Sequence, residues 1–271
     1  MKCFDKPFSV ITDRAKRCVA SSLILMGMAV THAVHADDSD NTESSWGLGV
    51  AVMSSQKAYT DIDSDVQAIP FVMYENEYFQ LMGPTFEFKL PSINLSKEQK
   101  INFGIIGSYD FSGYKAKDSP FLTGMQERKG GLWAGAKVQW QNPWADVTFE
   151  SLAEVSGDSE GSRFSFKIDR RWQITEDLSI TPRLAVNWFD EEYVSYYYGV
   201  QQTEVNAQRA FYAGDSAVNI ELGIRSNYMI NKNNFIIFDL EATSLATEIK
   251  DSPIVDSSTE TRALLGYIYY F

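Results

Sequence analysis

Apolar and polar side chains alternate with a period of two along most of the chain. Residues 178–188 show this clearly, because Leu, Ile, Pro, Leu, Val and Trp alternate there with Ser, Thr, Arg, Ala and Asn. Successive side chains of a strand point to opposite faces, so this pattern predicts strands with one apolar and one polar face. Beyond residue 36, no long segment has the i, i+3, i+4, i+7 spacing of an amphipathic helix. The sequence therefore predicts an all-β protein.

The alternating segments and the turn residues between them predict twelve strands. The longer segments reach the ~9–11 residues that a tilted strand needs to cross a bilayer. Both termini of such a protein should lie on the periplasmic side, so the strand count must be even. One apolar stretch, 78–90, is therefore divided at Gly83-Pro84, where proline interrupts the ladder of a strand. The predicted strands are 45–54, 66–75, 78–82, 85–90, 99–112, 130–140, 143–155, 162–175, 178–190, 216–230, 234–247 and 259–271.

Short and long connections alternate between these strands. Tight turns are expected near 141–143, 175–177 and 231–234, and long polar loops over 112–129, 190–215 and 247–258. Short turns at one end and long loops at the other are typical of an outer-membrane barrel. Lipid offers no hydrogen-bond partners, so the first and last strands must pair. We predict a transmembrane antiparallel β-barrel of about 12 strands, with 10 as the alternative, with short periplasmic turns and longer extracellular loops.

The N-terminal segment has the organisation of a secretory signal peptide. Basic residues precede an apolar run over 18–30, and small residues then lead to Ala36, after which we expect cleavage. The apolar run is too short to cross a bilayer as a helix. We therefore expect a signal peptide over 1–36 and one barrel domain over 37–271, located in the cell outer membrane.

Removal of residues 1–36 changes the chemistry that is available. The remaining segment has 19 basic and 34 acidic side chains, a net charge of −15, and it has neither Cys nor His. Disulfides, thiol nucleophiles, histidine bases and histidine metal ligands are excluded from it. We expect no catalytic, cofactor or metal site and no enzyme activity. The acidic excess argues against a nucleic-acid partner, because phosphate contacts need clustered Lys and Arg.

Charged side chains of both signs alternate with the apolar ones and are expected to face the lumen. They could line a solute path or pair across neighbouring strands, and their near balance favours pairing. Glu150 and Glu154 are expected to be ion-pair partners rather than the acid and base of a glycosidase. The inward set is Glu87, Lys89, Asp110, Lys137, Asp146, Glu150, Glu154, Lys167, Asp169, Arg171, Arg183, Glu221, Arg225, Asp239, Glu241 and Arg262.

The long loops hold three further features. Short helices are expected around 121–125 and 253–255, where Asp-Ser-Pro sequences over 118–120 and 251–253 supply a cap and a proline for the first turn. Asp61, Asp63 and Asp65 have a spacing that could bind calcium, but the Gly and distal Glu of a calcium loop are missing, which favours a solvated acidic loop. Three consecutive tyrosines form either a partner-binding patch or part of an aromatic girdle. These are Tyr196, Tyr197 and Tyr198.

The C-terminus carries an export signal. Gly266, Tyr269 and Phe271 have the G-x-x-aromatic-x-aromatic spacing of the terminal strand motif that the barrel assembly machinery reads. Leu264 replaces the polar residue usual two positions before the glycine. We expect these three residues to form the assembly signal, with that machinery as a partner.

Short motifs spread over the chain resemble the MipA/OmpV family. They occur at 46–50, 69–70, 124–125, 197–200, 210–214, 251–255 and 266–271. The loop 201–215 departs from the small-residue-rich version of the family, with Gln201, Gln202, Glu204 and Arg209.

The resemblance implies an outer-membrane barrel without catalytic residues. It also implies a scaffold that links a lytic transglycosylase to a penicillin-binding protein in peptidoglycan synthesis. The alternative is a small-solute channel, or a surface receptor or adhesin acting through its acidic extracellular loops. Outer-membrane lipid and lipopolysaccharide are expected as further partners.

Overall fold

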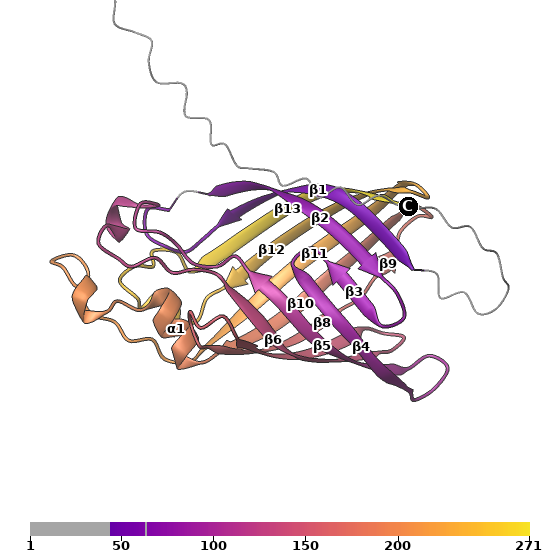
Figure 1. Cartoon of the computed structure of the whole chain (residues 1–271), viewed down its shortest axis with the longest axis horizontal. Coiled ribbons are helices and arrows are strands. Elements are labelled where there is room, and N and C mark those ends of the chain that lie inside the picture. The colour runs from indigo at the N-terminus through magenta and orange to yellow at the C-terminus, as the bar shows by residue number, and fades with distance from the viewer. Residues whose placement is uncertain (1–43, 63) are drawn as a thin grey trace, which may run out of the picture. The chain divides into compact units, whose positions relative to one another are not determined.

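A computed structural model describes residues 44–62 and 64–271 of the chain. In this part of the chain the strands form one antiparallel sheet, and β1 (Ser45–Gln56) pairs with β13 (Thr259–Tyr270), so the sheet closes into a barrel (Figure 1). β8 (Ser162–Asp169) and β9 (Trp172–Gln173) both pair with β10 (Leu178–Phe189) and occupy one position in the wall. The predicted barrel of twelve strand positions is confirmed. The expected signal peptide and Ala36 lie outside the described residues.

The remaining wall follows chain order. Its strands are β2 (Asp65–Glu75), β3 (Phe79–Met82), β4 (Thr85–Asn94), β5 (Lys100–Asp110), β6 (Gly131–Gln141), β7 (Asp146–Glu154), β11 (Ala217–Asn231) and β12 (Asn234–Ser244). The loops hold α1 (Glu191–Tyr198), α2 (Thr247–Lys250) and two 3-10 turns, Pro120–Leu122 and Gln202–Glu204. No helix within the described ranges is long and apolar enough to span a membrane.

The period of two places apolar side chains on the outside of the wall. Leu184, Leu222 and Leu240 on three successive strands are all exposed, as suits a surface that faces lipid. Polar side chains of the same strands, such as Asp239, are buried inside. Long loops and α1 gather at one end of the barrel, and short turns at the other (Figure 1). By the usual orientation of such barrels, the loop end faces outward and the turn end faces the periplasm.

The seam between β1 and β13 carries the expected assembly residues. Gly266 lies opposite Ala51 and is buried, while Tyr269 and Phe271 are exposed on the outer side. The ring of Phe271 stacks on Trp46, with 3.8 Å between ring centroids. The seam is therefore closed by backbone pairing and by an aromatic stack at the turn end. Recognition of these residues by the assembly machinery stays a prediction.

The loop helices differ from the prediction at two places. A 3-10 turn does begin at Pro120, capped by Ser119, whose Oγ accepts from Phe121 N at 3.0 Å. The helix expected over 253–255 is wrong: α2 lies earlier, at Thr247–Lys250, and Val255 forms an isolated bridge with Tyr59 instead. The tyrosine-rich segment forms α1, which the sequence pattern did not predict.

Candidate functional site

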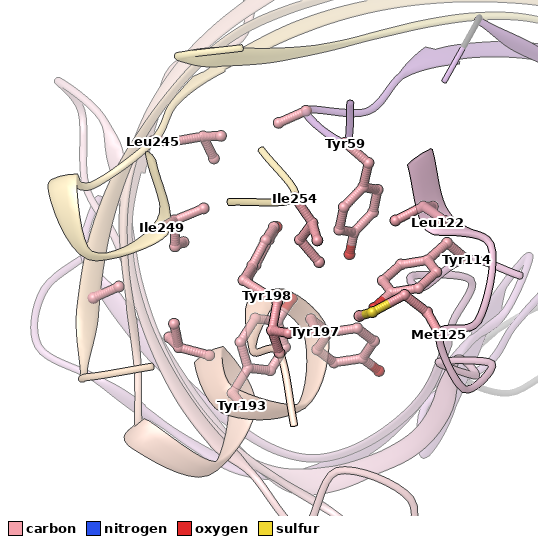
Figure 2. Close-up of a cluster of buried hydrophobic side chains, with 14 of the residues drawn as sticks. Tyr59, Tyr114, Leu122, Met125, Tyr193, Tyr197, Tyr198, Leu245, Ile249 and Ile254 are labelled. Carbon is pink, nitrogen blue, oxygen red and sulfur yellow. The ribbon is translucent and has the colours of Figure 1, made fainter. Parts of the chain in front are cut away.

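The long loops fold into the outer mouth of the barrel and close it. Figure 2 shows their buried apolar side chains gathered inside the ring of strands. We call this group the mouth cluster, and its labelled members come from four loops: Tyr59; Tyr114, Leu122 and Met125; Tyr193, Tyr197 and Tyr198; Leu245, Ile249 and Ile254. The cluster provides the apolar packing of a small domain core at the outer end of the lumen.

Helix α1 supplies the centre of the mouth cluster. Asp190 caps it: one carboxylate oxygen accepts from Tyr193 N at 3.0 Å, and the other accepts from Ser162 N at 2.6 Å. A capping carboxylate offsets the unpaired amides of the first turn, so this short helix forms despite its β-branched and aromatic residues. Tyr197 and Tyr198 then point inward, and the Tyr198 ring lies 5.5 Å from that of Tyr59.

The tyrosines of the mouth cluster stay neutral at physiological pH. Burial raises the pKa of Tyr59, Tyr193 and Tyr198 well above the ordinary phenol value. Burial also raises the pKa of Tyr114 to about 12. Neutral rings pack without charge repulsion, so the arrangement suits closure of the lumen.

A buried ion pair joins two of the loops. Arg128 and Glu204 have side chains that are 3% and 1% exposed, and Nη2 of Arg128 lies 2.8 Å from Oε2 of Glu204. The same carboxylate accepts from Gln126 N at 2.8 Å and from Gln201 N at 2.9 Å. We call this group, together with Arg209, the latch. It holds loop 111–130 against loop 190–216.

Arg209 is the second basic member of the latch. It is 2% exposed, and its guanidinium donates to the carbonyl oxygens of Phe121, at 2.5 Å, and Glu204, at 2.8 Å. Gln201, Glu204 and Arg209 are three of the residues by which this loop departs from the usual family version. Their departure from the pattern therefore has a structural role, which the sequence alone did not indicate.

Glu204 of the latch is ionised over the whole physiological range. Burial by itself raises the pKa of Glu204, but the amides of Gln126 and Gln201 and the Arg128 guanidinium outweigh it. The pKa of Glu204 therefore lies below its usual value. Because the charged carboxylate is the form that is bound, the latch weakens only when this group is protonated.

The inner wall of the barrel carries ion pairs that skip a strand. Arg183 on β10 donates to Asp239 on β12, with Nη1 2.9 Å from Oδ2, and to Glu241 on β12, with Nη2 2.7 Å from Oε2. Between them on β11 lies Gly223, where an added Cβ would approach Nη2 of Arg183 to 2.7 Å. Because Gly223 has no side chain, the guanidinium of Arg183 can pass over β11 to reach the acids on β12.

A second glycine does the same on the other side of the barrel. Lys137 on β6 pairs with Glu87 on β4, and Gly104 lies on β5 between those strands. A Cβ at Gly104 would lie 2.5 Å from Oε1 of Glu87. These contacts favour the interpretation of paired charges that fill a narrow lumen.

Glu150 and Glu154 do not form the ion pairs that the pattern predicted. Glu154 instead accepts from the backbone amides of the β7–β8 connection, including Asp158 N at 3.0 Å and Glu160 N at 3.1 Å. Glu154 lies just before a loop, so backbone amides without a strand partner are within its reach. Hydrogen bonds from such amides to a carboxylate are charge-assisted, as those from a basic side chain are. Glu150 lines a cavity of about 240 Å³ together with Arg163, Glu221 and Glu260.

The remaining predicted residues are placed as follows. Tyr197 and Tyr198 are buried in the mouth cluster, and Tyr196 is half-buried, with its hydroxyl accepting from Lys129 N at 2.9 Å. A partner-binding role for these three tyrosines stays a prediction. Asp63 lies outside the described residues, and within the described ranges no group of three or more His, Cys, Asp or Glu is placed to hold a metal ion.

The closed sheet, apolar outside and ion-paired within, is the architecture of a β-barrel of the outer membrane. The family model described as MltA-interacting protein MipA matches residues 48–271, and the chain belongs to this family. The resemblance and the outer-membrane location predicted from the sequence are confirmed.

Two relatives and one solved structure are similar to the chain. It is 25% identical over 233 residues to the putative outer membrane protein YiaT of Escherichia coli K12, covering 85% of this chain and 92% of that protein. It is 25% identical over 259 residues to the MltA-interacting protein of Escherichia coli K12, covering 93% and 100%. The NanC porin structure is similar with a TM-score of 0.41 at 8% identity, over 82% and 98% of the two chains.

The contact between Gly223 and the Arg183 side chain leads to a stability prediction. Gly223→Val should lower the stability of the purified barrel by about 2–3 kcal/mol, because Arg183 must leave several acceptors to avoid the new side chain. The urea midpoint of unfolding in detergent micelles measures this. Gly107→Val is the matched control, because a Cβ there meets nothing within 4 Å. Equal losses in both variants would contradict the strand-skipping role of Gly223.

The latch yields a pH prediction. Since the folded-state pKa of Glu204 is lowered, its stabilisation is complete above the unfolded carboxyl pKa of ~4.3 and is lost as pH falls through the folded value. Hydrogen exchange at the Gln126 and Gln201 amides should therefore show constant protection above pH 5 and declining protection below pH ~4. Glu204→Gln should cut protection about tenfold at neutral pH and abolish the titration. The exposed Glu191→Gln serves as control, and a parallel titration in E204Q would refute the assignment.

Proposed function

We propose that this protein is a non-enzymatic outer-membrane scaffold whose periplasmic end binds peptidoglycan-remodelling enzymes. The partners are a lytic transglycosylase and a penicillin-binding protein. The observation that carries the proposal is the relative named MltA-interacting protein, which aligns with 93% of this chain and over its own whole length. The closed mouth and the ion-paired lumen support it further, because they favour function at the rims over passage through the barrel.

The β4–β5 hairpin is the part of the periplasmic rim best suited to bind a protein. The register of the two strands shifts between Leu90 and Ile93, and beyond that bulge Ile93 and Leu95 are 51% and 55% exposed. In Figure 1 the turn after β4 projects at the turn end of the barrel. Exposed aliphatic side chains beside polar residues form the usual centre and rim of a protein interface.

A binding measurement with matched variants tests the scaffold. Purified barrel in micelles should bind a purified lytic transglycosylase, and Ile93→Asp/Leu95→Asp should weaken binding at least tenfold, because charges replace a dry contact. Val205→Asp/Phe211→Asp is the control, since these residues are similarly exposed, at 43% and 51%, but lie in a loop at the outer end. Binding no stronger than that of an unrelated barrel, or equal losses in both variants, would overturn the proposal.

A small-solute channel is the second candidate, favoured by the 240 Å³ cavity in the lumen. The two candidates differ in conductance. A scaffold with a closed mouth should give no steady single-channel current in a planar bilayer, whereas a channel should conduct without any change to the latch.

A further inference from the structure

The wall of the barrel is incomplete between β2 and β5. β3 has only four residues, and the chain turns back at Gly83-Pro84. β2 has eleven residues, so most of it, on the side of the loop end, extends beyond β3. The bond from Gly83 N to Val72 O, at 3.0 Å, is the last backbone hydrogen bond on this side of β2 within the described residues. The segment 65–71 therefore has a partner strand on one side only, namely β1.

The sequence of β2 fits an edge strand. Alternate residues of an antiparallel strand turn their backbone groups to the same side, so Pro70, Ala68 and Val66 follow Val72 along the open edge. Pro70 has no N–H to leave unpaired there. The amides of Ala68 and Val66 remain, and an unpaired amide in hydrocarbon costs several kcal/mol. Wherever this edge meets hydrocarbon, polar groups must therefore lie against it.

A groove of about 670 Å³ lies beside the open edge. Asp65 and Gln67 of β2 line one part of it, and the outward-facing Tyr109, Phe111 and Leu132 line another, all three of them exposed. At the top, Lys57 Nζ donates to Gly113 O at 2.6 Å and connects the end of β1 to loop 111–130. The groove thus lies between the start of β2, where Asp65 and Gln67 flank Val66 of the open edge, and lipid-facing apolar side chains.

Charge distinguishes loop 111–130, which lines most of this groove, from the two other long loops at the same end. Loop 111–130 has four basic and two acidic residues, whereas loop 190–216 has one basic and five acidic, and loop 245–258 has one basic and three acidic. Arg128 is occupied by Glu204, and Lys115, Lys117 and Lys129 line the groove together with the acidic residues Asp65, Asp118, Glu127 and Asp158. Lys115 contacts Glu127 at 3.3 Å in a largely exposed pair, which competes weakly with an incoming anion.

We propose that this groove binds the phosphorylated headgroup of lipid A, the acylated glucosamine disaccharide of the outer leaflet. Its phosphates pair with Lys115, Lys117 and Lys129, and its acyl chains lie over Tyr109, Phe111 and Leu132. Its sugar hydroxyls and acyl amides supply hydrogen bonds to the open edge of β2. An added peptide strand would satisfy the edge alone, while a lipid A headgroup also matches the lysines and the lipid-facing side chains. The proposal is independent of the scaffold function at the opposite end.

Native mass spectrometry of the barrel released from micelles tests this. Bis-phosphorylated lipid A should bind at least tenfold more tightly than its dephosphorylated form and than phosphatidylglycerol, because three lysines pair with its phosphates. Lys115→Gln/Lys117→Gln/Lys129→Gln should reduce lipid A binding at least tenfold. Lys97→Gln/Lys100→Gln/Lys232→Gln, a triple variant of the turn end, is the matched control and should bind as the unmodified protein does.

Two results would overturn the proposal. One is equal binding of phosphorylated and dephosphorylated lipid A to the unmodified protein. This comparison does not depend on whether a variant folds. The other is equal retention of lipid A by the two folded lysine variants, which would assign the lipid to a different surface.

Discussion

The requirement that every backbone amide in hydrocarbon have a partner governs this structure. It forces the first and last strands together, and the β1–β13 ladder with the Trp46–Phe271 stack meets that demand. Closing the sheet leaves one surface for lipid and one for the lumen, so the alternation of apolar and polar residues is a direct consequence. The open edge of β2 is the exception: Pro70 has no N–H to leave unpaired there, and a groove lies beside the edge.

The inside of the barrel and its outer mouth are filled by different interactions. Within the wall, charged side chains such as Arg183 reach across glycines to acids two strands away. At the mouth, the loops are held together by packing of neutral tyrosines and by the Arg128–Glu204 ion pair. Buried ion pairs give little net stability but penalise alternative arrangements, because one unpaired partner is costly. The charged side chains inside the wall are thereby held in one arrangement.

The sequence predicted the strands well because their period of two and their turns are local signals. The even strand number came from the expected periplasmic location of both termini, and Gly83-Pro84, where the apolar stretch was divided to keep it, marks a real turn. The latch did not follow, because Arg128 and Glu204 lie 76 residues apart and meet only after the loops fold. Helix α1 was missed because tyrosines resemble a membrane girdle, and only the cap at Asp190 distinguishes it. Glu154 was mistaken for an ion-pair partner because its donors are backbone amides, and a residue pattern does not indicate which amides a side chain will reach.

Cross-linking of the seam is the most direct test of barrel closure. Ser54 and Ala263 are partners across β1 and β13, and residues 37–271 contain no cysteine. Partners in an antiparallel ladder lie ~4.5–5.5 Å apart at Cα, within the range of a disulfide. Ser54→Cys/Ala263→Cys should cross-link under mild oxidation in outer-membrane preparations, and Ser54→Cys/Thr261→Cys, shifted by two residues, should not. Absence of the first cross-link, or equal yields of both, would contradict a closed barrel with this register.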